Sequence, residues 1–131
     1  KGCSIAQSIA HDSHNIIVVG DSDNEMAVAV NSLITIGGGV AIAAEGKLIA
    51  HLSLPIAGIM TFQEPNIVVE GLQRLIRIAR SYGLKAEYDP FITLSFLALP
   101  VIPELKLTAR GLFDYNKFDF INLCSDSTET K

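Results

Sequence analysis

The residues in this sequence best suited to chemistry are gathered in one short segment, His11, Asp12, Ser13, His14 and Asn15. Two imidazoles and a carboxylate are acceptable ligands for a divalent cation. A serine beside a histidine is a possible base-activated nucleophile. The third interpretation is a polar loop whose side chains bond one another and the nearby backbone. From these residues alone we favour the loop, because a short motif without its structural context is only a hypothesis.

Other segments with chemical potential have a simpler structural interpretation. His51 lies on a different expected strand, so it does not extend the histidine pair locally. The run Gly37–Gly39 follows an expected helix, whereas phosphate loops join a strand to a helix N-terminus. We therefore predict that these glycines end a helix. Arg74, Arg77 and Arg80 are predicted to form a solvated helix face rather than an anion site.

The polar segment is flanked by two expected strands. Residues 3–10 are small and apolar, and the β-branched run 16–19 is typical of a buried strand. A helix is predicted to follow, with Ser22 and Glu25 forming a capping box. It should end at Gly37, where a left-handed cap residue is available.

The rest of the chain alternates strand and helix patterns. We expect two strands over 40–44 and 47–54, joined by a turn at Glu45-Gly46. A helix should run from Glu64-Pro65 to Gly83, with a buried stripe formed by Val68, Leu72, Leu75, Ile76 and Ala79, and a short helix should follow Asp89-Pro90. The remaining expected elements are an edge strand over 105–108, a loop over 110–114 and a last strand over 118–122. This order predicts an α/β (α+β) class: a mixed sheet with helices packed on it as a layered sandwich. We expect one domain over residues 1–124 and a polar tail over 125–131.

Two irregular segments, 55–60 and 100–103, are unusually apolar. Loops are normally polar and exposed. They either cap one large core or form a contact surface for another domain. The sequence favours neither alternative over the other.

Composition excludes several classes of partner. The 131-residue chain has a net charge of −4, which gives no electrostatic footprint for nucleic acid or for an anionic membrane. No apolar run reaches the roughly 18 residues of a membrane helix. Two cysteines and no targeting pattern indicate reduced thiols in the cytoplasm. Because the chain starts without Met and enters an apolar pattern at once, we expect a piece of a longer protein.

Four segments, in order, resemble the C-terminal domain of bacterial-type adenine deaminases. They are residues 8–20, 37–39, 52–60 and 97–108, and the resemblance runs from Ser4 to about Ile121. One departure is Ala109, where the family usually has an acidic residue.

The resemblance implies a metal-dependent amidohydrolase that converts adenine and water to hypoxanthine and ammonia in purine salvage. Its catalytic barrel, with manganese or iron, would lie N-terminal to this chain, which would hold neither the metal ligands nor the main acid–base groups. A homo-oligomer is also expected. His11, Asp12, Ser13, His14 and Asn15 would then contact substrate or the neighbouring domain. The alternative is a non-catalytic binding or dimerisation module.

Overall fold

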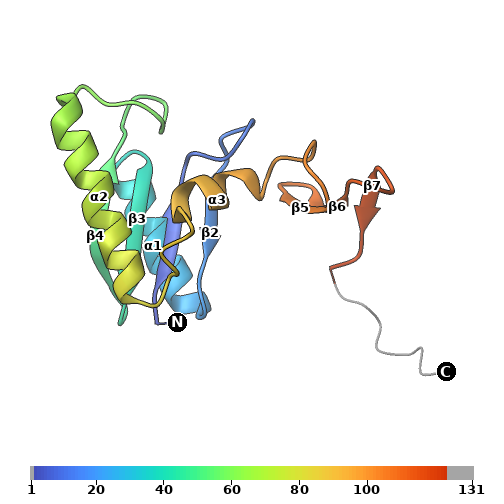
Figure 1. Cartoon of the computed structure of the whole chain (residues 1–131), viewed down its shortest axis with the longest axis horizontal. Coiled ribbons are helices and arrows are strands. Elements are labelled where there is room, and N and C mark those ends of the chain that lie inside the picture. Colours follow the sequence, from blue (N-terminus) through green and yellow to red (C-terminus); the bar gives the residue numbers. More distant parts are fainter. Residues whose placement is uncertain (1, 124–131) are drawn as a thin grey trace.

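The computed structural model describes residues 2–123, and its centre is a four-stranded sheet (Figure 1). The strands are β1 (Ser4–Gln7), β2 (Ile17–Val19), β3 (Gly39–Ala44) and β4 (Lys47–Ser53). Their spatial order is β2-β1-β3-β4, and every neighbouring pair is antiparallel. All four strands were predicted from the sequence, and the turn at Glu45-Gly46 is confirmed.

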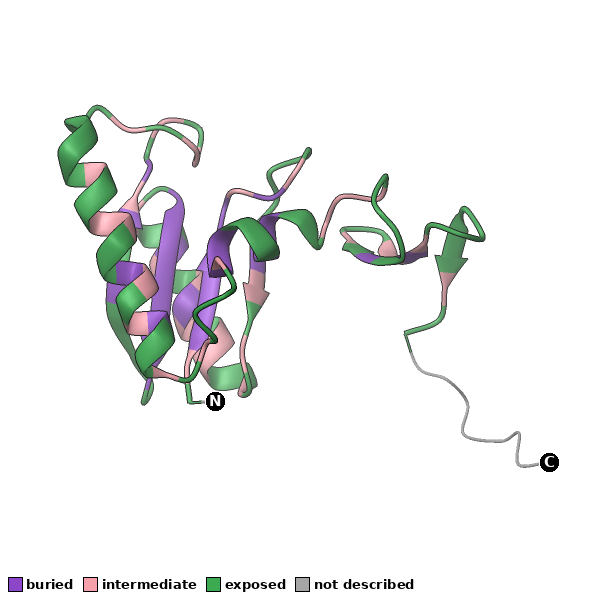
Figure 2. Cartoon of the chain, viewed as in Figure 1, coloured by how far each residue is buried: buried purple, intermediate pink, exposed green. Residues whose placement is uncertain are grey.

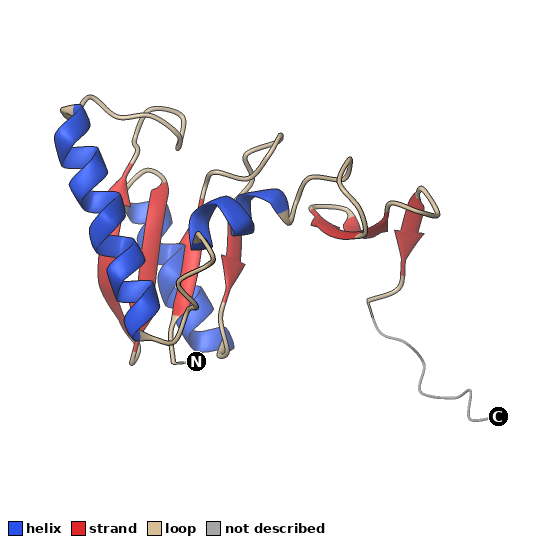
Figure 3. Cartoon of the chain, in the orientation of Figure 1, coloured by secondary structure: helices blue, strands red, loops and turns tan. Residues whose placement is uncertain are grey.

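Helices cover both faces of this sheet and make three layers (Figure 3). They are α1 (Asp23–Thr35), α2 (Pro65–Ser81) and α3 (Pro90–Phe96). Leu33 of α1 packs in one cluster, whereas Leu75 of α2 and Phe91 of α3 pack in a second cluster on the other face. The predicted stripe of α2 faces the second cluster: Leu75 and Ala79 are buried in it, and Val68, Leu72 and Ile76 pack against it partly buried.

The two central strands are buried along their whole length (Figure 2). Alternate residues of a strand point to opposite faces. Ala41 and Ala43 therefore face α1, and Val40 and Ile42 face α2 and α3. Small side chains on one face let α1 approach closely, and branched side chains fill the wider space on the other.

The ends of α1 follow the predicted chemistry only in part. Gly37, with a φ of 81°, donates its N–H to Ile34 O at 3.1 Å, and Gly38 donates to Leu33 O at 3.0 Å. This is the Schellman arrangement. At the other end Ser22 occupies the N-cap position, but its side chain accepts no capping hydrogen bond within the described residues. The capping box is therefore wrong: Glu25 Oε1 instead accepts from the N–H of Gly46 at 3.3 Å.

A second, three-stranded antiparallel sheet stands beside the sandwich (Figure 1). Its strands are β5 (Leu105–Thr108), β6 (Gly111–Asp114) and β7 (Asp119–Ile121). The loop predicted over residues 110–114 is wrong, because β6 pairs with a strand on each side. Its short run, Gly-Leu-Phe-Asp, is too brief for alternation to be recognised in isolation.

The α+β class with helices layered on a sheet is confirmed, although the strand pairs are all antiparallel rather than mixed in direction. None of the helices in the described part of the chain is both long and apolar enough to cross a membrane. The extent of one domain over residues 1–124 stays a prediction. The predicted tail over residues 125–131 lies outside the described residues.

Candidate functional site

The segment His11–Asn15 is the loop that joins β1 to β2, and α3 holds its first residue. The N–H of His11 donates to Ser95 O at 3.0 Å. The His11 ring stacks on Phe96 with a centroid distance of 5.1 Å and an interplanar angle of 23°. A backbone hydrogen bond and a ring contact thus fix the position of His11, and both come from residues 84 and 85 positions further along the chain.

Inside the loop the polar side chains do not assemble a nucleophile. The His14 ring meets the His11 ring edge-on at 5.4 Å, and the His14 N–H donates to Ala10 O at 2.6 Å. Asn15 Nδ2 donates to Ser13 Oγ at 3.1 Å. Among the described residues no hydrogen bond joins Ser13 to a histidine, so the structure does not pair the Ser13 hydroxyl with a base.

The loop also lacks the geometry of a metal site. His11 Nδ1 and Asp12 Oδ1 are 4.0 Å apart, and the Asp12 side chain is 88% exposed. Across residues 2–123 no three His, Cys, Asp or Glu side chains form a group able to hold an ion. His51 pairs in register with Ala41 on the other side of the sandwich and does not join the loop.

Ser8 connects three segments at the end of the sheet that carries this loop. Its buried Oγ accepts the N–H of Gly39 at 2.7 Å and donates to the carbonyl of Gly58. The Ser8 N–H donates to Gly39 O at 3.0 Å, and the Leu54 N–H donates to Gly38 O at 2.9 Å. The chain after β1, the glycine turn and the apolar 55–60 segment are therefore fastened together.

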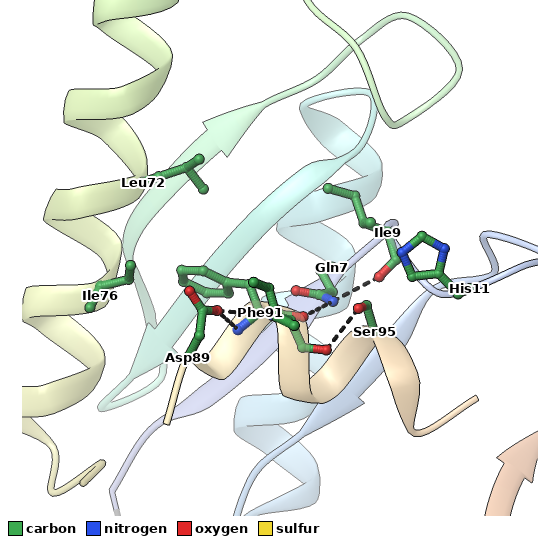
Figure 4. A pocket seen from close by; sticks show the side chains of 9 residues that line it. Gln7, Ile9, His11, Leu72, Ile76, Asp89, Phe91 and Ser95 are labelled. Carbon is green, nitrogen blue, oxygen red and sulfur yellow. Dashed lines mark hydrogen bonds between the residues drawn. The ribbon is translucent and has the colours of Figure 1, made fainter. Parts of the chain in front are cut away.

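A cavity of about 270 Å³ lies between β1, α2 and α3 and reaches His11 (Figure 4). Gln7, which is fully buried, donates from Nε2 to Ile9 O at 2.7 Å and to Phe91 O at 2.9 Å. Its Oε1 has no hydrogen-bond partner among the described residues. Leu72 and Ile76 supply an apolar wall, so this cavity would accept a mainly apolar group.

A smaller cavity of about 150 Å³ joins the loop to the second sheet. It is lined on one side by Asn15 and Ile16, and on the other by Leu107, Thr108 and Ala109 among others. The residue that departs from the family pattern, Ala109, is thus placed beside the polar loop. No local pattern indicates this proximity, because more than 90 residues separate the two segments.

The apolar segment after β4 stays at the surface instead of closing the core. Pro55 and Met60 are exposed, and Phe62 just beyond is 91% exposed. Val101 and Ile102 in the second apolar segment are exposed as well. Of the two alternatives left open by the sequence, these exposures support a contact surface.

Two polar residues with structural roles at this site, Gln7 and Ser8, were not singled out from the sequence. Both lie inside the apolar segment 3–10. A buried polar side chain needs hydrogen-bond partners. Polar residues inside an expected buried strand were therefore the signal that could have identified them.

Comparison with known proteins decides the family. The model of the adenine deaminase C-terminal domain matches residues 1–119. The chain belongs to this family. It is 53% identical to an adenine deaminase of Desulfatibacillum aliphaticivorans, 49% to adenine deaminase 2 of Carboxydothermus hydrogenoformans and 48% to an adenine deaminase of Geobacillus kaustophilus. Each alignment covers 92% of this chain and 21% of the relative, so the chain spans about a fifth of the length of these proteins.

Proposed function

We propose that this chain acts as the C-terminal domain of an adenine deaminase, a hydrolase that converts adenine and water to hypoxanthine and ammonia. The family match and the names of the relatives support this activity for the whole protein. The reaction would serve purine salvage in the cytoplasm, as the family resemblance implies. The catalytic barrel would belong to the part of the relatives that this chain does not cover.

One observation carries a more specific proposal: parts of all four segments that resemble the family meet around the end of the sheet that carries the loop His11–Asn15. The loop His11–Asn15, the glycine turn and the 55–60 segment meet through Ser8. The segment 97–108 reaches the same loop through the cavity beside Asn15. We propose that this end faces the catalytic barrel.

In this arrangement the loop His11–Asn15 contacts substrate or closes the active site. Asp12, Ser13, His14 and Asn15 are exposed, so their polar groups are accessible to a substrate or to another domain. A neutral imidazole offers one donor and one acceptor, which suits hydrogen bonding to a heterocyclic base. The loop acts by contact and by exclusion of water, since no nucleophile is assembled in it.

The described residues do not fit the divalent metal that the family resemblance implies. They contain no three-ligand group, and Asp12 is turned to solvent. We therefore propose that manganese or iron is bound by the barrel alone, and we assign this domain no step that involves the metal. Assembly of the enzyme as a homo-oligomer remains part of the proposal.

The test is His11→Ala and His14→Ala in the intact enzyme, with His51→Ala as the matched control. We expect both loop variants to lose about tenfold or more in kcat/KM for adenine, which corresponds to about 1.4 kcal/mol of transition-state stabilisation. The metal content should stay unchanged, and the control should turn over normally because His51 lies across the sandwich from the loop.

Wild-type turnover in both loop variants would exclude the contact role. A loss of metal in either variant would also contradict it, because it would make the loop a metal ligand. The reading frame upstream of Lys1 is a simpler test. A barrel-sized region with metal-binding histidines supports the enzyme, whereas a start codon near Lys1 supports the free-standing binding or dimerisation module.

A further inference from the structure

One face of the three-stranded sheet carries a row of partly exposed aliphatic side chains. Register places Leu107 opposite Leu112 and Leu112 opposite Ile121, so these side chains form a row across β5, β6 and β7. Leu105 lies two residues before Leu107 and shares its face. Leu105 is 47% exposed and Leu107 is 49% exposed. We call these four residues the β5–β7 face.

The opposite face of the same sheet is made of aromatic side chains that pack on one another. Phe113 is buried and meets Phe118 and Phe120 edge-on at 5.5 and 5.4 Å. The Arg110 guanidinium lies 5.1 Å from the centroid of Phe120. Lys106 is buried on this side, with its Nζ donating to two backbone carbonyls. Phe118 and Phe120 stay 78% and 40% exposed, so these aromatic side chains pack on one another without a covering layer, whereas the β5–β7 face presents a continuous aliphatic row.

A sheet this small gains little stability from its pairing alone. β5, β6 and β7 pack mainly on one another. Three strands become stable when a hydrophobic face packs on another layer. Two carboxylates border the apolar row on this face, because Asp114 lies opposite Leu105 and Asp119 lies opposite Asp114. Asp114 Oδ2 is 3.7 Å from Lys117 Nζ. An apolar centre with a polar edge is the usual composition of an interface.

We infer that the β5–β7 face docks against the portion of the same polypeptide that precedes this domain. The inference rests on the proposed function. Curated relatives carry about four fifths of their length outside the matched region, and the matched family is a C-terminal domain. A covalently attached neighbour is present at high effective concentration. The cavity between Asn15 and Leu107 also makes this face continuous with the loop end proposed to face the barrel.

The small extent of the face argues against a second copy as its occupant. It presents four apolar side chains on strands of four, four and three residues. A stable interface between separate proteins buries about 800 Å² on each partner and engages roughly 20–30 residues on each side. A tethered neighbour loses less translational freedom on docking, so a smaller face is sufficient.

The experiment is photo-crosslinking in the intact enzyme, with a benzophenone-bearing amino acid replacing Leu107 and, in a second variant, Leu105. The control replaces Ile34, which is 61% exposed on α1. Illumination of mixed ¹⁵N-labelled and unlabelled enzyme, followed by peptide mapping, separates links within one chain from links between copies. We expect links from positions 105 and 107 to the preceding region of the same chain, and none of these from position 34.

The inference would be overturned by links between copies. It would also be overturned if neither β5 variant formed a link in the folded enzyme. Its failure is distinguishable from failure of the proposed function. The histidine variants test turnover without testing the sheet, and the crosslinks test docking without testing turnover. Normal activity in the histidine variants together with the expected crosslinks would leave the docking face in place and remove only the contact role of the loop.

Discussion

At the scale of single residues, Ser8 has more structural consequence than any member of the polar loop. Its buried hydroxyl accepts a hydrogen bond from the Gly39 N–H and donates one to the Gly58 carbonyl. The space around it leaves no room for larger neighbours: a Cβ on Gly38 would lie 2.5 Å from Gly58 Cα and 3.0 Å from Ser8 Oγ. The segments of the proposed barrel-facing end therefore depend on one hydroxyl and on glycine beside it.

We predict that Ser8→Ala lowers the free energy of unfolding by about 1–3 kcal/mol, because it leaves the buried Gly39 N–H without its acceptor. Urea unfolding measures the loss. Ser81→Ala is the control, since its hydroxyl bonds only the exposed turn at Ile78 and should cost less than about 0.5 kcal/mol. Equal stability of the two variants would mean that the Ser8 connection contributes nothing.

Cys3 yields a prediction about pH. Burial raises the pKa of its thiol, and the carboxylates of Asp21 and Glu25 act in the same direction. A raised pKa leaves less thiolate at a given pH, and the thiolate is the reactive form. We expect the alkylation rate of Cys3, followed by peptide mapping, to rise with pH about a midpoint above that of free cysteine. The midpoint reports the pKa whatever the accessibility. A midpoint at or below that of free cysteine would be inconsistent with this environment.

At the scale of elements, α3 is the support for the polar loop. Asp89 Oδ1 accepts the N–H groups of Phe91 and Ile92, both at 2.9 Å, and so caps the helix. Pro90 follows in the first turn, where its missing N–H has no cost. The far end of the same helix carries Ser95 and Phe96, which hold His11. A local capping signal thus controls the position of a loop distant in sequence.

We predict that Asp89→Ala destabilises the protein by about 1 kcal/mol, as expected for loss of an N-cap. Ser22→Ala is a matched control: Ser22 occupies the same position on α1 without making a capping bond, and should change stability by only a few tenths of a kcal/mol. Hydrogen exchange at the His11 amide should accelerate in Asp89→Ala alone. If Asp89→Ala and Ser22→Ala lower the free energy of unfolding equally, the cap of α3 contributes nothing to stability.

At the scale of the whole molecule, the two helical layers share one sheet. Ile42 and Ala43 are neighbours in β3, yet they pack into clusters on opposite faces. Loss of either layer exposes the same strands. The three layers should therefore unfold together.

We predict that Leu33→Ala and Leu75→Ala, one on each face, each cost about 2–5 kcal/mol, because both side chains are fully buried. Unfolding of the sandwich should remain a single transition, with the same midpoint by circular dichroism and by hydrogen exchange of β1 and β3 amides. Ile34→Ala, on the exposed side of α1, should cost less than about 0.5 kcal/mol. Two separate transitions for the two faces would contradict a shared core.

The features predicted correctly from the residues alone are ones that depend on neighbours in the chain. The stripe of α2 repeats every three or four residues, Asp89-Pro90 begins α3, and Gly37 ends α1. Such signals involve residues within about one turn of each other, so they can be read locally. The same holds for the chemical candidates, because the polar residues His11–Asn15 are consecutive. Their contact role stays a prediction.

Which of these local segments meet depends on contacts between residues far apart in the chain. Ser8 contacts Gly58 across 50 residues, and His11 stacks on Phe96 across 85, distances at which no periodic pattern survives. β6 was missed for the same reason, since it is defined by two partner strands rather than by its own four residues. The polar loop is a candidate site because folding gathers the other segments of family resemblance around it. Within the described residues folding brings no third metal-binding side chain to it.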